Sequence, residues 1–236
     1  MTERSKRHMS RSATHFQVGP SHLRWNGQSL EIAIHERSLP TGQKVSGVVR
    51  VFPEQLFHFV TPLDDRKQHH WGPIAPSGRV DVELSAPALS WSGHAYLDAN
   101  EGREPVIGGF TEWDWSRANM QDGSVSVLYD IRQKSGEDRL LALKFNRDQT
   151  VSHFEAPPRH ALPKAFWRVG RSIRSDLQHP PKVLQTLEDT PFYVRSVMES
   201  TICHERVISM HETLNIPRLD RTTTRLMLPF KMPRVR

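Results

Sequence analysis

Short turn-forming pairs recur along this chain and separate segments whose side chains alternate between apolar and polar. Asn26-Gly27 divides "LRWNGQSLEIAIHE", Asp122-Gly123 divides "ANMQDGSVSVLYDI", and Ser135-Gly136 follows soon afterwards. Asn-Gly and Asp-Gly between alternating segments are the strongest short signals for a β-hairpin. Together with a further turn at Asn146–Asp148, they predict at least three consecutive hairpins and therefore an antiparallel sheet.

The prolines limit what can lie between these hairpins. The chain has 17 of them, spread over stretches such as "PIAPSG", "EAPPRHALP" and "QHPPK". Because proline breaks the interior of a helix, we expect an all-β chain with at least about 35% strand and no helix longer than about ten residues. The 236 residues suffice for two β domains. The Pro-rich segment 156–163 is the candidate linker between a first domain at 1–155 and a second at 156–236.

The net charge of +6 lies at the two ends of the chain. Residues 1–11 carry four basic and one acidic side chains, and residues 218–236 carry six and one, which leaves 22 basic against 24 acidic residues between them. A nucleic-acid site would gather its cations among stacking aromatic rings on the folded body, so no nucleic-acid partner is predicted. The basic ends suit solubility or weak attachment to an anionic membrane surface.

Several classes of site are absent from the sequence. The single cysteine, Cys203, excludes an internal disulfide and suits a reducing compartment, and the chain contains no apolar run of the length that a membrane span needs. No Gly-rich phosphate loop and no GxSxG elbow occurs. "HETLN" at 211–215 has an asparagine where a zinc-protease helix needs its second histidine. We therefore predict neither a cofactor nor a metal.

Two nearby segments place a carboxylate among aromatic rings. "HHWGPIAP" at 69–76 and "SWSGHAYLDANEG" at 90–102 contain His69, Trp71, Tyr96 and Asp98. Side chains alternate between the faces of a strand, so His69 shares a face with Trp71, and Tyr96 shares one with Asp98. If both segments line one cavity, the four side chains converge. The alternative is that the rings are ordinary core residues and that Asp98 caps a turn.

Long blocks of the sequence resemble one enzyme family. These blocks are "HHWGPIAPSGRVDVEL", "SWSGHAYLDANEGREPV", "FTEWDWSRA", "TLEDTPFYVRS", "MHETL" and "RLMLPFKMPR", and the similarity runs from about residue 1 to the last residue. They resemble the carotenoid 1,2-hydratases, or hydroxyneurosporene synthases, of photosynthetic bacteria. The resemblance implies a lipocalin-like fold with two β-barrel-like halves. It also implies a cofactor-independent hydro-lyase of carotenoid biosynthesis that adds water to the terminal 1,2 double bond of neurosporene or lycopene.

Hydration of such a bond suggests a chemical role for each of the four side chains His69, Trp71, Tyr96 and Asp98. The alkene must be protonated on carbon to give a tertiary carbocation, and Asp98 is the expected donor, because burial against rings raises the pKa of a carboxyl group. Trp71 and Tyr96 are expected to stabilise the cation through their faces. His69 either orients Asp98 or accepts a proton from the incoming water, and the sequence leaves both open. Asp114 in "EWDWSR" and Asp189 in "LEDTPFY" are the other candidate acids.

Compared with that family, the chain lacks an amino-terminal segment rich in Trp, Tyr and Gly. If the segment supplies strands to the first half, that half is incomplete and leaves an exposed edge. The alternative functions are a non-catalytic lipocalin-like protein that binds a carotenoid or lipid, and another cofactor-independent enzyme on the same scaffold, such as a pericyclase. We expect a cytoplasmic protein, either free or peripheral on the inner, photosynthetic membrane, whose partners are an acyclic carotenoid and water.

Overall fold

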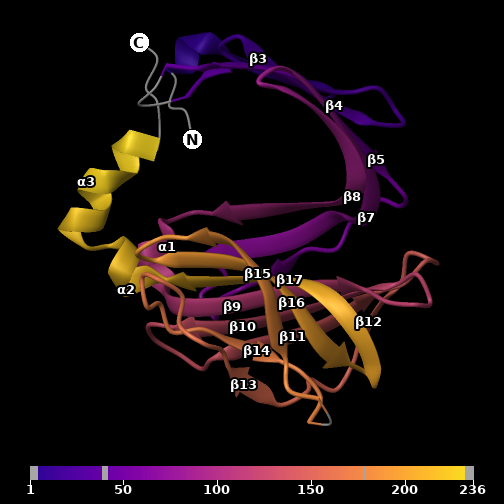
Figure 1. Cartoon of the computed structure of the whole chain (residues 1–236), viewed down its shortest axis with the longest axis vertical. Helices are drawn as coiled ribbons and strands as arrows, with labels where there is room; N and C mark the ends of the chain where they lie inside the picture. The colour runs from indigo at the N-terminus through magenta and orange to yellow at the C-terminus, as the bar shows by residue number, and fades with distance from the viewer. Residues whose placement is uncertain (1–4, 39–41, 178, 232–236) are drawn as a thin grey trace. The chain divides into compact units, whose positions relative to one another are not determined.

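The computed structural model describes residues 5–38, 42–177 and 179–231 of the chain. Strands account for 59% of the described residues and helices for 8%, and the two main sheets are antiparallel, so the predicted all-β class is confirmed (Figure 1). The longest helix in these ranges, α3 (Thr222–Lys231), has ten residues. The expected limit on helix length is therefore also confirmed.

The first sheet has eight strands in the order β1-β2-β3-β4-β5-β7-β6, with β8 paired to β7. Its strands are β1 (Met9–Arg11), β2 (His15–Val18), β3 (Ser21–Trp25), β4 (Leu30–Arg37), β5 (Lys44–Pro53), β6 (Thr61–Pro62), β7 (His69–Ala86) and β8 (Ala88–Gly102).

The second sheet has seven strands in the order β12-β11-β10-β9-β17-β16-β15, and a separate hairpin pairs β13 with β14. The strands are β9 (Phe110–Asn119), β10 (Val125–Gln133), β11 (Arg139–Phe145), β12 (Val151–His153), β13 (Arg159–Ala161), β14 (Ser172–Arg174), β15 (Lys182–Asp189), β16 (Tyr193–Ile202) and β17 (Glu205–Asn215). Within the described ranges both strand orders are open paths rather than closed barrels.

Helices are short and lie at the connections. They are η1 (Lys6–His8), α1 (Val106–Gly109), α2 (Ile216–Leu219) and α3. Of the helices in the described part of the chain, none has the length and apolar character needed to cross a membrane. The described portions of both basic ends belong to regular elements, η1 and β1 at one end and α2 and α3 at the other.

The predicted turns join the predicted strands. Gly27 has a φ of 95°, and the side-chain oxygen of Asn26 accepts hydrogen bonds from the backbone N–H groups of Gln28 and Ser29 at 2.9 and 2.8 Å. Gly123, with a φ of 78°, closes the turn between β9 and β10. A positive φ at these positions favours glycine, because it has no Cβ to clash. The hairpin predictions are therefore confirmed.

The chain divides into two compact units. Unit 1 comprises residues 1–56, 77–97 and 225–236, and unit 2 comprises residues 57–76 and 98–224. The strands β7 and β8 pass from one unit to the other. This division does not coincide with the boundary at 155/156, since the second sheet contains strands from both sides of it. Domains at 1–155 and 156–236 stay a prediction.

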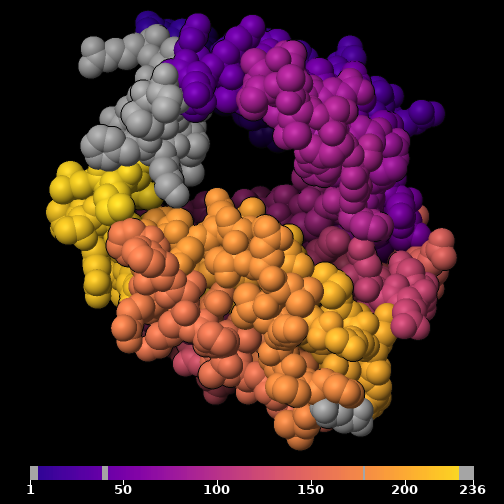
Figure 2. Space-filling view, viewed as in Figure 1, coloured from indigo at the N-terminus to yellow at the C-terminus, as the bar shows by residue number. Residues whose placement is uncertain are grey.

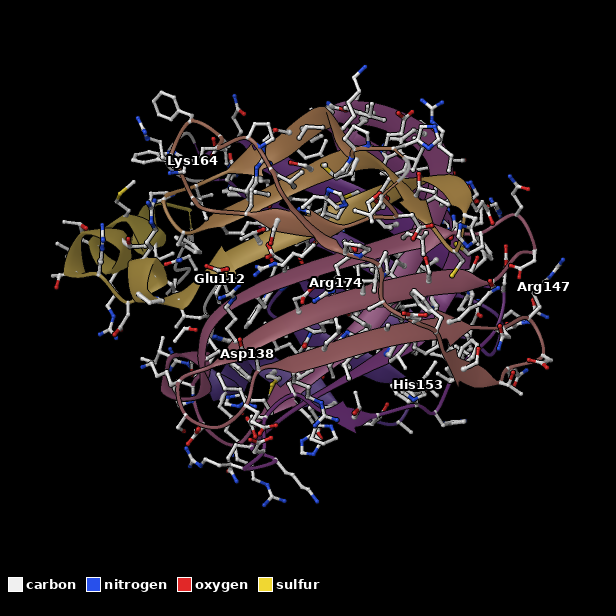
Figure 3. All side chains as sticks on the ribbon, turned by 90° about the horizontal axis from the view of Figure 1, so that it is seen from below. Glu112, Asp138, Arg147, His153, Lys164 and Arg174 are labelled. Carbon is white, nitrogen blue, oxygen red and sulfur yellow. The ribbon has the colours of Figure 1, made fainter. Side chains whose placement is uncertain are left out.

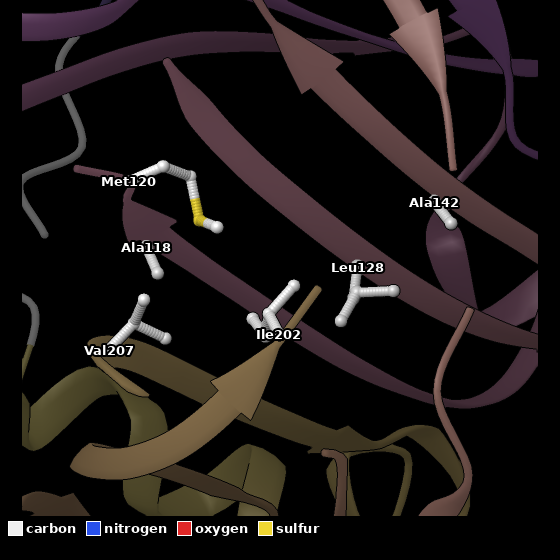
Figure 4. Packing of buried hydrophobic residues seen from close by; sticks show 6 residues of the cluster. All are labelled: Ala118, Met120, Leu128, Ala142, Ile202 and Val207. Atoms are coloured by element: carbon white, nitrogen blue, oxygen red, sulfur yellow. The ribbon is translucent and has the colours of Figure 1, made fainter. Parts of the chain in front are cut away.

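One face of the second sheet carries a compact apolar cluster (Figure 4). Cross-strand partners project from the same face of a sheet, and the register pairs Ala118 with Ser126 and Leu128 with Ala142 along this face. Phe154 and Ala156 pack against the cluster, so the segment predicted as a linker begins as part of the core of unit 2. The cluster consists of Ala118, Met120, Leu128, Ala142, Ile202 and Val207.

Candidate active site

Trp71 and Asp98 form a direct contact in unit 2. The indole Nε1 of Trp71 donates a hydrogen bond of 2.8 Å to Oδ2 of Asp98, and only 1% of Trp71 is exposed. Asp98 lies inside β8 rather than in a turn, which removes the turn-capping alternative. The indole N–H lies in the ring plane, so Asp98 contacts the edge of the Trp71 ring rather than its face.

Aromatic rings surround this pair. Trp71 packs edge-to-face against Tyr129 at a centroid distance of 5.7 Å and against Phe145 at 6.4 Å. Tyr129 in turn meets Trp113 at 6.2 Å, and Trp113 meets Phe110 at 5.9 Å. Perpendicular packing of this kind is favoured by the ring quadrupoles and excludes water from the space between the rings. The indole–carboxylate pair therefore lies beside a continuous aromatic layer.

Tyr129 carries a hydroxyl close to two carboxylates. Burial raises the pKa of Tyr129 well above its usual range, and the negative charges of Asp98 and Glu212 raise it further. The phenol therefore keeps its proton at every physiological pH.

Glu212 reaches the same face of the second sheet through the strand register. Glu212 on β17 pairs with Trp115 on β9, and Trp115 pairs with Tyr129 on β10. Cross-strand partners share a face, so all three side chains project from the aromatic face of the sheet. This face is opposite to the one that carries the apolar cluster.

Glu212 is held by two neighbours from β16. The guanidinium Nε of Arg195 lies 2.9 Å from both Oε1 of Glu212 and the hydroxyl of Tyr193. Burial and the nearby charge of Glu212 raise the pKa of Tyr193. The aromatic face therefore contains a second carboxylate, charge-paired and fixed in position.

His69 is engaged through both of its ring nitrogens. Nε2 lies 2.9 Å from the carbonyl oxygen of Glu104, which can only accept, so Nε2 carries a proton. Nδ1 lies 2.5 Å from Oδ2 of the buried Asp64. A Cβ added at Gly102 would lie 2.8 Å from Cδ2 of His69, so glycine is needed where β8 ends. Neither nitrogen is available to Asp98, and a catalytic role for His69 stays a prediction.

Asp64 remains charged despite its burial. Burial alone would raise its pKa, but hydrogen bonds from His69 and from the backbone N–H of Gln68, at 2.8 Å, hold the pKa of Asp64 below its usual range. The pair fixes the first residue of β7 two positions before Trp71. The Asp64–His69 contact is therefore suited to positioning the Trp71 indole.

An apolar pocket of about 240 Å³ borders Trp71. Its wall includes Phe57, Phe59, Ile74 and Ala99, the last being the neighbour of Asp98 in β8. Ligand pockets of this kind bury apolar groups and orient them with few polar atoms. The pocket can take the end of an apolar chain but not a complete long polyene.

All 236 residues match the family model described as carotenoid hydratase CrtC. The chain belongs to this family. It is 52% identical over 234 residues to the acyclic carotenoid 1,2-hydratase of Rubrivivax gelatinosus. The matched region covers 99% of this chain and 58% of that protein. It is 43% identical over 236 residues to the acyclic carotenoid 1,2-hydratase of Thiocapsa roseopersicina, and the match covers 58% of that protein. It is 34% identical to the acyclic carotenoid 1,2-hydratase of Rhodobacter capsulatus, and the match covers 83% of that protein. The chain thus spans little more than half the length of the first two relatives.

In this carotenoid hydratase family member, Tyr96 lies in β8 two residues before Asp98 and is half-buried. Strand alternation directs the two side chains to the same side of β8. Tyr96 belongs to unit 1, whereas Asp98, Trp71 and His69 belong to unit 2. The structure therefore brings Trp71 and Asp98 together, and the shared cavity of all four residues stays a prediction.

Asp114 lies on the opposite face of the sheet from Trp113 and Trp115, because side chains alternate along β9. Its carboxylate accepts hydrogen bonds from Arg159 at 2.6 Å, from the hydroxyl of Ser172 at 2.7 Å and from Thr213. These contacts with Arg159 and Ser172 anchor the β13–β14 hairpin to the sheet through Asp114.

Asp189 and the "HETLN" stretch were the other candidates in the sequence. Oδ2 of Asp189 accepts a weak bond of 3.4 Å from the backbone N–H of Trp167. The "HETLN" stretch lies on strand β17. Across the described ranges, no group of three or more His, Cys, Asp or Glu side chains is arranged to hold a metal ion.

Tyr129 and Glu212 were not identified from the sequence as candidate site residues. Alternation in "SVSVLYDI" puts Tyr129 on one face with Val127 and Ile131, but does not say which rings it meets. Glu212 sits in "MHETL", whose resemblance to the family was noted without a role for the glutamate. Only the pairing of β17 with β9 joins it to the aromatic face.

Proposed function

We propose that this chain catalyses the hydration of acyclic carotenoids at the terminal 1,2 double bond, as a cofactor-independent hydro-lyase of carotenoid biosynthesis. Membership of the carotenoid hydratase family and the names of the relatives support this proposal. The observation that carries it is the Asp98 carboxyl, bound to the Trp71 indole beside a layer of rings. Acyclic carotenoids such as neurosporene or lycopene are the proposed substrates.

Asp98 is the proposed proton donor. The Trp71 N–H binds Oδ2 and orients the carboxyl group, whose proton is proposed to move to C2 of the substrate. The π electrons of the alkene form the new C–H bond and leave a tertiary cation at C1, while Asp98 becomes a carboxylate. General acid catalysis of this kind contributes typically about 10²–10⁴-fold in rate.

Aromatic side chains are the proposed stabilisers of the cation. Trp71, Tyr129 and Trp113 lie together in unit 2, and Tyr96 is proposed to add a fourth ring. A cation over a desolvated ring is stabilised by about 2 kcal/mol, and a ring offers no nucleophile that traps the cation. His69 is proposed to act from a distance, by fixing β7 through Asp64.

Glu212 is the proposed acceptor of the proton that the water loses. Water forms the C–O bond at C1, and the resulting oxonium is so strong an acid that even a carboxylate paired with Arg195 takes its proton. The enzyme then holds its proton on Glu212 instead of Asp98. The Tyr129 hydroxyl, which lies within the influence of both charges, is proposed to return it.

The proposed location is cytoplasmic, peripheral on the inner membrane. A long apolar polyene dissolves in a bilayer and not in water, so the enzyme has to take its substrate from a lipid phase. The basic ends are proposed to add about 1 kcal/mol of attraction per Lys or Arg near an anionic surface.

Isotope labelling tests the reaction directly. The chain is incubated with lycopene in vesicles, in H₂¹⁸O and separately in D₂O, and the product is analysed by mass spectrometry. The proposal predicts a 1-hydroxy product with one ¹⁸O, and one deuterium at C2. Unchanged lycopene that nevertheless co-purifies with the protein contradicts catalysis and supports the carrier alternative.

A further inference from the structure

One loop of unit 2 presents two large aromatic rings to solvent. The loop Pro163–Arg168 connects β13 to β14, and in it Phe166 is 84% and Trp167 41% exposed. Their rings meet perpendicularly at a centroid distance of 5.6 Å. Within the described ranges, Phe166 is the most exposed of the large apolar side chains. The rings form a small apolar protrusion that the fold itself does not use.

The backbone under these rings is held firmly. The N–H of Arg168 donates to the carbonyl of Ala165 at 2.9 Å and closes a tight turn. The guanidinium of Arg218 donates to the carbonyls of Trp167 and Arg168 at 2.8 and 3.1 Å. The buried side chains of Leu162 and Val169 anchor the two flanks. The exposure of the rings is therefore a property of a fixed turn and not of a loose loop.

Cationic side chains bracket the rings. Lys164 and Arg168 are both exposed, and the stretch "PKAFWRVGR" contains no acidic residue. Neither cation forms an ion pair with any residue in the described part of the chain. Figure 3 shows Lys164 at the margin of unit 2, on a loop outside the strands. In Figure 2 the orange segment of the chain, which includes residues 163–168, lies at the molecular surface.

We propose that Pro163–Arg168 is a membrane-docking loop, which places Phe166 and Trp167 at the lipid interface and Lys164 and Arg168 on anionic headgroups. Aromatic rings prefer the headgroup level of a bilayer, and cations near an anionic surface strengthen such attachment. A lipid surface suits a convex protrusion with this composition. The choice of a membrane rests on the proposed function, because the substrate of that function dissolves in lipid.

Co-sedimentation with vesicles tests the loop without any carotenoid, so its result is independent of hydratase activity. The 236-residue protein is mixed with vesicles of phosphatidylglycerol and phosphatidylcholine. The double variant Phe166→Ser/Trp167→Ser is expected to bind at least about tenfold more weakly, because the apolar area placed in lipid is lost. Leu177→Ser is the matched control, since Leu177 is 75% exposed on another connection. Binding of the double variant equal to that of the wild type overturns the proposal.

The cations of the loop are tested against those of the amino-terminal end. Lys164→Gln/Arg168→Gln is expected to weaken binding to anionic vesicles and to leave binding to phosphatidylcholine vesicles unchanged. Lys6→Gln/Arg7→Gln removes the same charge from η1. If only the η1 variant loses binding, the basic end and not the loop is the attachment site.

Depth of insertion gives a spectroscopic readout. Brominated lipids quench a tryptophan only when it reaches the bilayer, so the wild type is expected to show quenching on binding. Trp167→Phe keeps an aromatic ring and should still bind, but without most of the quenching. Equal quenching in wild type and Trp167→Phe shows that another tryptophan contacts the lipid and contradicts the assignment.

Discussion

The contact between Trp71 and Asp98 gives the tryptophan a polar as well as an aromatic role. The N–H binds Oδ2 of Asp98 and thereby fixes the orientation of the carboxyl group. A hydrogen bond between neutral groups contributes about 0.5–1.5 kcal/mol, and leaving a buried partner without one costs about 1–3 kcal/mol. The orientation of the acid therefore depends on a nitrogen that phenylalanine lacks.

Trp71→Phe should therefore lower hydration about tenfold to a hundredfold, because the acid loses the hydrogen bond from the Trp71 indole. Trp113→Phe is the matched control: it keeps an aromatic ring in the same layer and removes no bond to Asp98. The measurement is the conversion of lycopene by each purified variant. Equal losses in both variants would show that ring size and not the N–H matters.

Glu212→Gln should reduce hydration by about a hundredfold or more while carotenoid binding persists, because the amide cannot accept the proton of the attacking water. Glu199→Gln is the control, a charge-paired glutamate at the surface of the neighbouring strand β16. Bound carotenoid and product are measured in the same samples. Normal turnover by Glu212→Gln would remove the second carboxylate from the mechanism.

The lowered pKa of Asp64 predicts a pH dependence of stability. A carboxyl whose pKa is lower in the folded state stabilises the fold above its unfolded value of about 4, and this contribution is lost as the pH falls through the folded value. Asp64→Asn should lower Tm near neutral pH, and the difference from wild type should shrink on acidification. Asp65→Asn, at the exposed neighbouring position, is the control. A difference in Tm that is constant between pH 7 and pH 3 contradicts this assignment.

At the scale of elements, the hairpins were predictable because their signals are local. Asn26-Gly27 and Asp122-Gly123 set a turn with a few neighbouring residues, and each flanking strand pairs with the next along the chain. Strand β13 of the hairpin β13–β14 lies instead within the segment 156–163 that was predicted as a linker. Its position depends on Arg159, which bonds Asp114 more than 40 residues earlier, and prolines at its ends gave no sign of this.

The hairpin contact should matter for stability rather than for chemistry. Asp114→Asn removes the buried carboxylate bound to Arg159, which keeps only its longer contact of 3.5 Å with Glu112, and breaking a buried pair costs about 3–5 kcal/mol. A large drop in Tm is expected, with unchanged conversion per folded molecule at a temperature where the variant is folded. Lys144→Gln, which breaks the more exposed pair with Asp122, should lower Tm far less. Loss of turnover in fully folded Asp114→Asn would give Asp114 a part in the reaction.

At the scale of the whole molecule, the sequence pointed to the contact between Trp71 and Asp98 but not to Glu212. Trp71 and Asp98 could be paired because two segments close in sequence each alternate along a strand. Glu212 could not, because the crossover that puts β17 beside β9 joins strands almost a hundred residues apart and no local pattern encodes that register. The contacts of the two His69 ring nitrogens could not be predicted from the sequence either, because Asp64 and the Glu104 carbonyl lie in separate segments of the chain.

The central claim is that Asp98 donates the proton to the alkene. Asp98→Asn keeps the shape of the side chain and an oxygen for the Trp71 N–H but cannot transfer a proton. Conversion of lycopene to its 1-hydroxy product by this variant, measured by chromatography beside the amount of carotenoid bound, is the most direct test. The account predicts a fall of about 10²–10⁴-fold or more in conversion with binding retained. Conversion close to that of the wild type, at equal binding, would contradict it.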